Sequence, residues 1–376
     1  MKFDAVIIGA GVFGCTLAEK LASRNKTVRL IEKRSHIGGN AYSSFDADTN
    51  IEIHKYGSHI FHTNNEDVWN YINQFTTFNS YIHKVKIETD IGLLPVPINL
   101  ETISRAFDLK LDSMQAKALL AQETMHLGEN SENLEDWAKS EIGIRLYDLL
   151  IKGYTKKQWD TDPKDLPSSI IARLPIRYDL EDRYFVDKFQ GLPREGYEQL
   201  FKNMIDNPLI KLELETDFFD IRDQFDSDQL VIYTGPIDRF FDFSKGKLNW
   251  RTLDFDIETI ETNHYQSLAV INSASEDVSF TRTHEFKHFY PERIQSQNKT
   301  IIAREFSRRA EPHDEPYYPV GTFEDKMNLA EYKKLIEKLP NVYFGGRLGS
   351  YQYLDMHMAI NQAHITFKEL MRSRWH

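Results

Sequence analysis

Residues 3–14 read FDAVIIGAGVFG. The first half of this stretch is a continuous apolar run, which is typical of a strand buried on both faces of a parallel sheet. Gly9, Gly11 and Gly14 follow at the spacing GxGxxG, and the apolar side chains of residues 12–25 then recur at helical spacing. A strand, a glycine turn and a helix in this order predict a dinucleotide-binding βαβ unit.

Each glycine of this turn has a physical task. Gly9 permits the tight turn, Gly11 lets the backbone approach a pyrophosphate, and Gly14 permits close packing of the helix on the strand. The helix N-terminus adds N–H groups and a partial positive charge. Glu32 ends the second predicted strand, residues 27–32, where its carboxylate can accept ribose hydroxyls. The alternative to a dinucleotide-binding site is a glycine-rich turn that binds no ligand.

A second glycine-rich stretch lies near the C-terminus, at residues 345–356 (GGRLGSYQYLDM). It offers another helix start close to Asp355, where backbone amides can meet a bound ring. A further glycine pair, Gly38-Gly39, comes after the second strand. This layout favours FAD over NAD, since only one GxGxxG is present and no second nicotinamide site is visible. Further candidate cofactor-binding residues are Lys33, Asn40, His59, Ile60, Arg347 and Met356.

The composition limits the class of protein. The chain has 376 residues, 41% of them hydrophobic, so we expect a globular protein with more than one core. Its net charge of −11 argues against nucleic-acid binding, and its single cysteine excludes an intrachain disulfide. No apolar run approaches the roughly 18 residues of a membrane span, and the N-terminus lacks a signal-peptide pattern. We therefore expect a cytoplasmic protein.

The remaining pattern predicts an α/β fold in which a Rossmann-like domain is built from both chain ends. We expect residues 1–78 and 318–376 to form this FAD-binding domain, and residues 79–165 to form a helical insert, with Asn99 and Asp112 as helix N-caps. Alternating apolar and β-branched residues predict a largely antiparallel sheet domain at 166–317, with a substrate lid near 167–178. Its expected strands are 211–216, 229–234, 267–272, 278–290 and 300–306.

Several longer motifs make the chain resemble the UDP-galactopyranose mutase family over nearly its whole length. They are YGSHIFHT (56–63), KGYTKKQW (152–159), RLPIR (173–177), YF (184–185) with FQGLP (189–193), YTGP (233–236), TR (281–282), PYYP (316–319) and GRLGSYQYLDM (346–356). Taken together they are far more specific than one dinucleotide fingerprint.

The resemblance implies a flavin-dependent mutase. Such an enzyme interconverts the pyranose and furanose forms of a nucleotide-diphosphate sugar, of the UDP-galactopyranose to UDP-galactofuranose type, in the biosynthesis of cell-surface polysaccharides. N5 of reduced FAD attacks the anomeric carbon, and there is no net redox change. The resemblance further implies a reductant such as NAD(P)H or a reductase, and a homodimer with contacts in the helical insert.

By the same resemblance, Arg173 and Arg282 hold the diphosphate. Guanidinium groups suit this task, because they stabilise the charge that develops as the diphosphate leaves. The alternative to a diphosphate-binding role is that each arginine lies at the surface and pairs with an acidic residue. His62 and Asp355 are the other expected catalytic residues. The expected substrate-binding residues are Tyr154, Trp159, Tyr184, Phe185, Asn272, Tyr318, Tyr353 and His83.

Alternatives remain for single residues. Aromatic residues five apart, as Tyr154 and Trp159 are, usually belong to a core. His59 and His62 at i, i+3 suggest a metal, but no third ligand of suitable spacing appears, and we expect none.

Four residues depart from the family pattern. His83, Ser58, Asp160 and Leu150 stand where members often carry Asn, Pro, Gly and, in some, Phe. These changes surround the substrate rather than the flavin. The natural substrate is therefore open between UDP-galactose and a variant such as UDP-N-acetylgalactosamine or dTDP-linked fucose. Two other classes, an FAD oxidase and a flavin-binding regulatory module, also share the dinucleotide pattern.

Overall fold

The computed structural model describes residues 3–125, 133–171 and 175–375. A five-stranded sheet in the order β16-β10-β1-β2-β9 forms the base of the first domain, and all its pairs are parallel. Its strands are β1 (Ala5–Ile8), β2 (Val28–Ile31), β9 (Ile210–Glu213), β10 (Val231–Tyr233) and β16 (Val342–Phe344). The predicted Rossmann-like α/β domain is confirmed.

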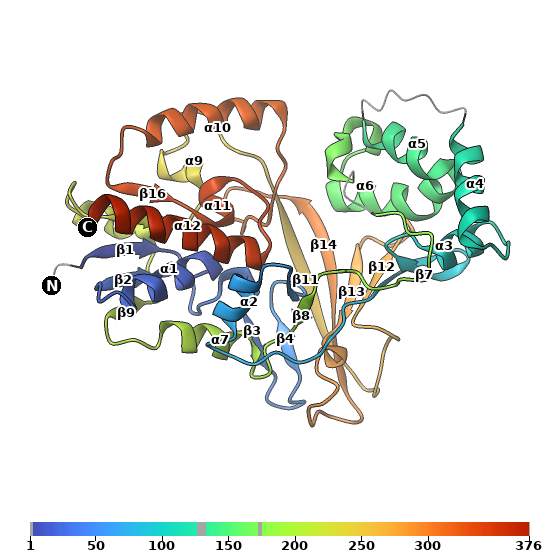
Figure 1. Cartoon of the computed structure of the whole chain (residues 1–376), viewed down its shortest axis with the longest axis horizontal. Helices are drawn as coiled ribbons and strands as arrows, with labels where there is room; N and C mark the ends of the chain where they lie inside the picture. Colours follow the sequence, from blue (N-terminus) through green and yellow to red (C-terminus); the bar gives the residue numbers. More distant parts are fainter. Residues whose placement is uncertain (1–2, 126–132, 172–174, 376) are drawn as a thin grey trace.

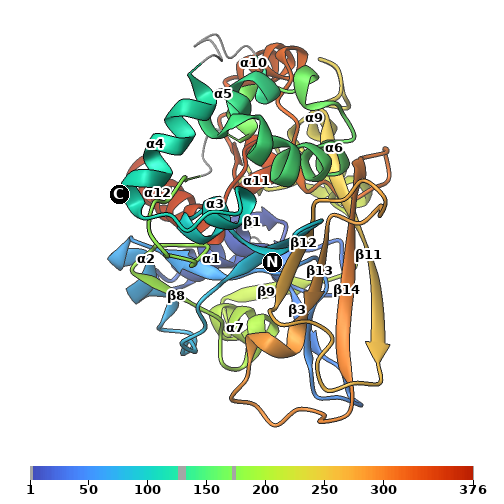
Figure 2. The same cartoon turned by 90° about the vertical axis from the view of Figure 1, so that its right-hand side faces the viewer.

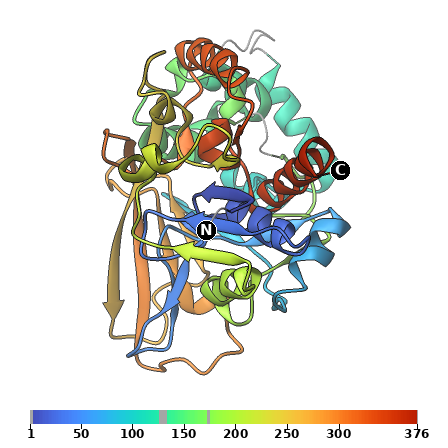
Figure 3. The same cartoon turned by 90° about the vertical axis from the view of Figure 1, so that its left-hand side faces the viewer.

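Helices from opposite ends of the chain cover this sheet. The buried face of α1 (Val12–Ala22) packs beside the C-terminal helix α12 (Met356–Arg374), and both contribute to one apolar core. Figures 1 and 3 show the blue N-terminal strands and the red C-terminal helices in the same domain. The other helices outside the insert are α2 (Glu66–Ile72), α7 (Gly196–Ile205), α8 (Phe218–Ile221), α9 (Ile237–Phe240), α10 (Phe323–Ile336) and α11 (Gly346–Ser350).

A seven-stranded sheet in the order β15-β11-β14-β13-β12-β6-β7 forms the second layer. Every neighbouring pair is antiparallel except β12 with β6, so the predicted largely antiparallel sheet is confirmed. Its strands are β6 (Val85–Thr89), β7 (Gly92–Val96), β11 (Trp250–Ile260), β12 (Val270–Ser273), β13 (Arg282–Glu285), β14 (Thr300–Arg309) and β15 (Tyr318–Pro319). Two small pairs complete the strands: β3 (Ser43–Phe45) with β4 (Glu52–His54), and β5 (Phe61–Thr63) with β8 (Phe189–Gly191).

Two strand assignments made from the sequence are wrong. Residues 211–216 and 229–234 were expected in the antiparallel sheet, but they supply β9 and β10 of the parallel sheet. β10 lies between β1 and β16 and β9 lies beside β2, so the segment 166–317 contributes to both sheets. The expected strand 278–290 is also shorter, because a 3₁₀ turn at Phe286–Phe289 ends it after β13.

A helical insert stands at the β6–β7 edge of the second sheet (Figure 2). Its helices are α3 (Leu100–Ala106), α4 (Ser113–Thr124), α5 (Leu134–Leu146) and α6 (Gly153–Trp159), with a π-helical turn at Tyr147–Lys152. The predicted N-caps are confirmed. The side chain of Asn99 accepts a bond from Thr102 N (3.0 Å), and Asp112 forms a capping box with Gln115. An apolar core of its own holds the insert together.

None of the helices that the structure describes combines the length and apolar character needed to cross a lipid bilayer.

Candidate active site

The loop between β1 and α1 has the shape that the GxGxxG pattern requires. Gly9 has φ 101°, and a Cβ atom there would lie 2.0 Å from Thr234 Oγ1. A Cβ on Gly14 would lie 1.9 Å from the carbonyl oxygen of Gly9, so only glycine lets α1 pack this close to β1. At Gly11 an added Cβ would meet only the Cα atom of Gly39, at 3.9 Å, so no protein atom crowds this side of the backbone. Within the described residues, the N-terminus of α1 has no side-chain cap, and its first turn contains no acidic residue, so its N–H groups can receive an anion.

Glu32, the acidic residue of the pattern, holds this loop in place through hydrogen bonds. Glu32 is buried, and its carboxylate accepts bonds from the N–H groups of Ala10 (2.8 Å) and Arg34 (2.9 Å). Asn40 Oδ1 accepts a bond from Arg34 (2.9 Å), and Lys33 pairs with Glu315 (2.7 Å). Glu32 therefore links the glycine turn to the end of the second strand, where a ribose would lie against it.

The second glycine-rich stretch forms a turn and two helix starts. Gly345 lies against the Phe13 ring of α1, where a Cβ would come within 2.2 Å of the ring. Arg347 donates bonds to the carbonyl oxygens of Tyr317 (3.3 Å) and Leu354 (2.8 Å) and lies 5.0 Å from the centre of the Tyr353 ring. Asp355 is the N-cap residue of α12, but its side chain makes no capping bond, so the first N–H groups of that helix remain available.

A cavity of about 340 Å³ is lined by the seven-stranded sheet, the helical insert, the loop before β5 and the C-terminal glycine-rich stretch. At one end it reaches the start of α12 and the loop before β5, and at the other it reaches Leu150, Ile151 and Tyr154 of the insert. The expected site residues that line it are His59, Ile60, His62, His83, Tyr154, Tyr184, Phe185, Asn272, Arg282, Tyr318, Arg347, Tyr353, Asp355 and Met356. A second hollow, of about 460 Å³ beside β16 and α10, is lined by one charged residue, Lys333, and by no acid or histidine.

Three polar side chains stand in a row across the second sheet at this cavity. The strand register places Asn272 of β12 opposite Arg282 of β13, and Arg282 opposite Glu305 of β14. Arg282 Nε lies 3.3 Å from Glu305 Oε1, and its Nη2 group donates to the hydroxyl of Tyr154. Burial alone would lower the pKa of Arg282, but the facing carboxylate of Glu305 outweighs this effect and the pKa is raised. Arg282 is thus a permanent, partly enclosed cation.

Tyr154, Tyr184 and Tyr318 lie around this cation, and Tyr353 lies in the same cavity beside Arg347. Burial raises the pKa values of Tyr154, Tyr318 and Tyr353, so their hydroxyl groups stay protonated at neutral pH. A protonated hydroxyl group can donate a hydrogen bond to an anionic oxygen. One arginine with several tyrosine donors is an arrangement suited to a diphosphate.

Histidines lie toward the α12 end of the cavity. Burial lowers the pKa of His59 to about 4 and that of His83 to about 3, so both are neutral near pH 7. The ring of His62 stacks on Phe185 at 3.7 Å, and its Nδ1 atom lies 2.7 Å from Asp187 Oδ2. This pairing fixes the orientation of the His62 ring.

Comparisons with known proteins agree with this geometry. A model of the UDP-galactopyranose mutase family matches residues 149–353, and a model of NAD(P)-binding Rossmann-like domains matches residues 7–75. The chain is 39% identical over 370 residues to a probable UDP-galactopyranose mutase of Klebsiella pneumoniae, covering 98% of this chain and 95% of that one.

The chain belongs to the UDP-galactopyranose mutase family. It is also 38% identical to a dTDP-fucopyranose mutase of Escherichia coli, covering 95% of this chain and 96% of that one. Among solved structures, a reduced UDP-galactopyranose mutase matches with a TM-score of 0.75 at 14% identity, covering 100% of this chain and 97% of that one. A putrescine oxidase bound to putrescine matches with a TM-score of 0.59 at 10% identity, covering 99% of both chains, which shows a shared fold.

FAD is the cofactor of the UDP-galactopyranose mutase family, and the residues of this chain fit it. The uncapped start of α1 and the uncrowded backbone at Gly11 suit a pyrophosphate, and Glu32 suits a ribose. Arg347, Met356 and the uncapped start of α12 would meet the flavin ring. When bound and reduced, FAD supplies a nucleophilic ring nitrogen.

Not every expected site residue reaches the cavity. Trp159 packs, half-buried, against the core of the helical insert, and Arg173 lies outside the described residues, as does part of the expected lid. Sequence reasoning missed Glu305 and His284, which line the cavity, and Asp187, which holds His62. Asp160, where the family often has glycine, adopts φ 52° and ψ 39° after α6, a left-handed conformation that aspartate tolerates better than most residues.

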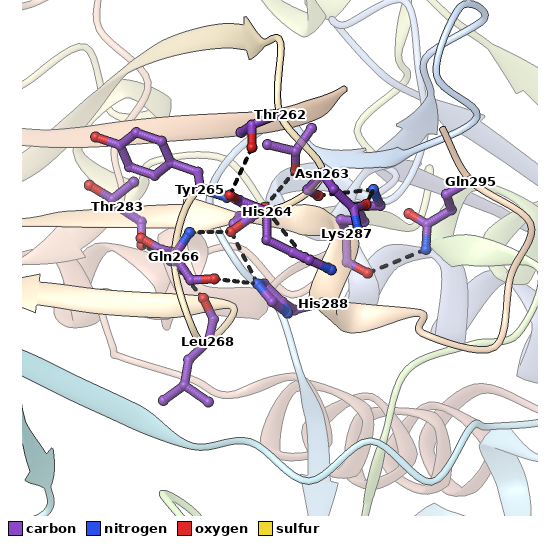
Figure 4. Close-up of polar contacts among 12 residues, drawn as sticks. Thr262, Asn263, His264, Tyr265, Gln266, Leu268, Thr283, Lys287, His288 and Gln295 are labelled. Atoms are coloured by element: carbon purple, nitrogen blue, oxygen red, sulfur yellow. Dashed lines mark hydrogen bonds and ion pairs between the residues drawn. The ribbon is translucent and has the colours of Figure 1, made fainter. Parts of the chain in front are cut away.

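A second group of histidines surrounds Glu285, the last residue of β13, and has a structural role. Glu285 accepts bonds from Tyr265 N (3.0 Å), Gln266 N (2.8 Å) and Thr300 Oγ1 (2.7 Å), and His288 Nε2 lies 3.0 Å from its Oε2 atom. Figure 4 shows His288 and His264 beside the loop that contains Tyr265 and Gln266. Because the buried carboxylate already has these donors, the cluster is explained as a loop anchor.

Proposed function

We propose that the protein interconverts the pyranose and furanose forms of a nucleotide-diphosphate sugar, with UDP-galactose as the first candidate substrate. The observation that carries the proposal is the partly enclosed Arg282 cation, ringed by tyrosine donors, in the cavity that the start of α12 reaches. An amine oxidase needs an apolar cage at its flavin, whereas this arrangement suits a diphosphate.

The roles of individual residues follow from their positions. Arg282, with Arg173 from the lid segment, would hold the diphosphate and stabilise its charge as it leaves. Tyr184, Tyr318 and Tyr353 would donate hydroxyl groups to the same oxygens. Tyr154, on the insert side of Arg282, would lie against the base.

The sugar would lie near Asn272 and His83. Asn272 is buried, and its Oδ1 atom has no hydrogen-bond partner within the part of the chain that the structure describes. A buried acceptor without a partner is costly, and a sugar hydroxyl group would satisfy it. His62 and Asp355, at the flavin end, would orient the reacting sugar and the flavin ring.

A variant sugar nucleotide is the second candidate. Leu150 and Ile151 give the insert end of the cavity an apolar wall, and His83 lies in the expected sugar pocket. An apolar wall suits a methyl group, such as that of thymine, and the similarity to a dTDP-fucopyranose mutase points the same way. dTDP-fucose and UDP-N-acetylgalactosamine are therefore the alternatives to UDP-galactose.

A panel of sugar nucleotides tests both candidates. Dithionite-reduced holoenzyme is incubated separately with UDP-galactose, UDP-N-acetylgalactosamine and dTDP-fucose, and the products are separated by chromatography. We expect a furanose product while the flavin stays reduced. Stoichiometric oxygen consumption with an amine or another reductant would instead identify an oxidase, and no product with any sugar nucleotide would overturn the proposal.

We further propose a cytoplasmic homodimer with contacts in the helical insert, which receives electrons from NAD(P)H or a reductase and serves cell-surface polysaccharide synthesis. The single buried cysteine, Cys15, is compatible with a reducing compartment. The apolar side chains of Met114 on α4 and of Met125, the C-cap residue of that helix, are exposed, which supports a contact there. Light scattering of the holoenzyme would test the dimer.

A further inference from the structure

Ser58 and His284 face each other in the wall of the cavity. Ser58 lies in the loop before β5, and its Oγ atom is 2.6 Å from His284 Nδ1. His284 lies two residues after Arg282 on β13, so both side chains project from the same face of the strand. The His284 ring is buried among Phe255 and Phe286, which restricts its orientation.

The hydrogen bonds fix the position of each proton. His284 Nε2 lies 3.1 Å from Glu305 Oε2. The pKa of Glu305 is lowered, because the Arg282 charge and the bond from His284 outweigh its burial, so Glu305 is an anion that can only accept. Nε2 of His284 therefore carries a proton. Burial lowers the pKa of His284, so the ring is neutral at pH 7.5 and its Nδ1 atom accepts. The hydroxyl group of Ser58 must then donate to Nδ1.

The chain of contacts from Ser58 through His284 extends beyond Glu305 to the expected diphosphate site. While one oxygen of Glu305 accepts from His284, the other lies 3.3 Å from Arg282 Nε. The guanidinium group in turn donates to the hydroxyl of Tyr154. A single chain of contacts thus runs from Ser58 to Tyr154, with Arg282 as its fourth member.

A positive charge on His284 would disturb this chain. His54, His59 and His83 all face His284 from neighbouring segments, and Arg282 lies beside it. The three histidines have lowered pKa values and are neutral, so an imidazolium ion would repel Arg282 and compete with it for Glu305. Such a proton would bind at Nδ1, and the Ser58 hydroxyl group would then have to turn from donor to acceptor.

We propose that Ser58 and His284 are positioning residues for Arg282. The serine hydroxyl group keeps His284 neutral with its proton on Nε2, His284 holds one oxygen of Glu305, and the other oxygen holds Arg282 with its terminal nitrogens toward the diphosphate. The inference rests on the proposed function for the role of the diphosphate. The chain of contacts itself is independent of it.

The tautomer of His284 can be observed directly. Holoenzyme labelled with ¹⁵N-histidine is studied by NMR, and the His284 signals are assigned by their loss in His284→Gln. We expect an Nε2–H imidazole with Nδ1 as an acceptor at pH 7.5, and its protonation at higher pH in Ser58→Ala than in wild type. A signal of the Nδ1–H form, or of imidazolium, in the wild type at pH 7.5 would overturn the proposal.

Ligand binding and kinetics test the effect on Arg282. In Ser58→Ala we expect the affinity for UDP and the value of kcat/KM each to fall roughly fivefold to tenfold, the effect of one lost hydrogen bond. The acid limb of the pH profile should move to higher pH, since Nδ1 is then free to bind a proton. Ser58→Thr keeps the hydroxyl group and should restore both values.

Ser140→Ala is the matched control. Its hydroxyl group donates to the carbonyl oxygen of Trp137 on α5, away from the cavity, so its loss should change neither value. Unchanged UDP affinity and an unchanged pH profile in Ser58→Ala would overturn the proposal. Failure of the wild-type enzyme to convert any sugar nucleotide would instead overturn the proposed function, and NMR and UDP titration would still decide the role of the pair.

Discussion

Arg282 and Glu305 occupy facing positions on neighbouring antiparallel strands, and Nε of the arginine lies 3.3 Å from a carboxylate oxygen of the glutamate. The carboxylate is buried, so its charge needs this partner. The same contact leaves the terminal nitrogens of the guanidinium group directed to the cavity side, where Tyr154 lies. One ion pair therefore serves both the stability of the sheet and the binding of an anion.

Replacement of the arginines tests their expected role. Arg282→Ala and Arg173→Ala should each lower turnover roughly 10²-fold or more, because the charge on the leaving diphosphate loses a partner. Turnover is measured with reduced enzyme and the best sugar nucleotide of the panel. The flavin absorbance of each purified variant serves as the control and should equal that of the wild type. Near-wild-type turnover in either variant would contradict the role.

Two glycine substitutions separate cofactor binding from folding. Gly11→Val should give a folded but colourless protein, because an added Cβ there meets no protein atom closer than 3.9 Å and occupies the space expected for the pyrophosphate. Gly14→Ala should destabilise the protein itself, since its Cβ would come 1.9 Å from the carbonyl oxygen of Gly9. Absorbance at the flavin band and circular dichroism distinguish the two results. A yellow Gly11→Val protein would disprove the first.

Acid should destabilise the holoenzyme over a defined range. Burial lowers the pKa of His59 to about 4 and that of His83 to about 3, from an ordinary value of 6.5. Between pH 6.5 and these lowered pKa values the unfolded chain binds more protons than the folded one. The contribution of the two histidines to the free energy of unfolding is therefore fully present above pH 6.5 and is lost as the pH falls toward 4. Thermal midpoints measured across this range should decline. His83→Asn should reduce the slope, whereas His313→Asn, at an exposed position, should not.

The contact between the insert and the sheet depends on Gly153. A Cβ at this residue would lie 2.1 Å from the carbonyl oxygen of Ala274. Gly153→Ala should therefore push α6 from the sheet, at a cost of about 1–3 kcal/mol, and move Tyr154 from Arg282. We expect weaker UDP binding by titration and unchanged flavin content. The exposed residue Lys152, which pairs with Asp148 inside the insert, provides the control variant, Lys152→Ala, and equal UDP affinity in the two would refute the argument.

The sequence predicted the first βαβ unit well because its signals are local. Glycine spacing, an apolar run and an acidic residue lie within residues 3–32, so no distant partner is needed to interpret them. The strands at 211–216 and 229–234 were misassigned for the opposite reason. A short β-branched strand looks the same in a parallel or an antiparallel sheet, and the partners of β9 and β10 lie almost two hundred residues or more away, at β2 and β1.

Some residues of the candidate site could likewise be predicted from the sequence, and others could not. Arg282 and the tyrosines were found through motifs that the family resemblance supplied. Glu305, His284 and Asp187 carry no such motif, and their importance comes from strand register and from contacts between distant segments. A carboxylate opposite an arginine becomes visible only when the pairing of β13 with β14 is known.

Because the chain is synthesised from its N-terminus, the C-terminal strand and helices determine when the cofactor site is complete. β16, α11 and α12 complete the cofactor domain, yet they come from residues 342–374, after the insert and the second sheet. While the ribosome still holds this segment, β10 has no partner on one side and the Arg347 end of the site does not exist. We therefore expect FAD to bind only after residues 342–374 have been synthesised. A chain truncated before β16 should be purified without the yellow colour of bound flavin.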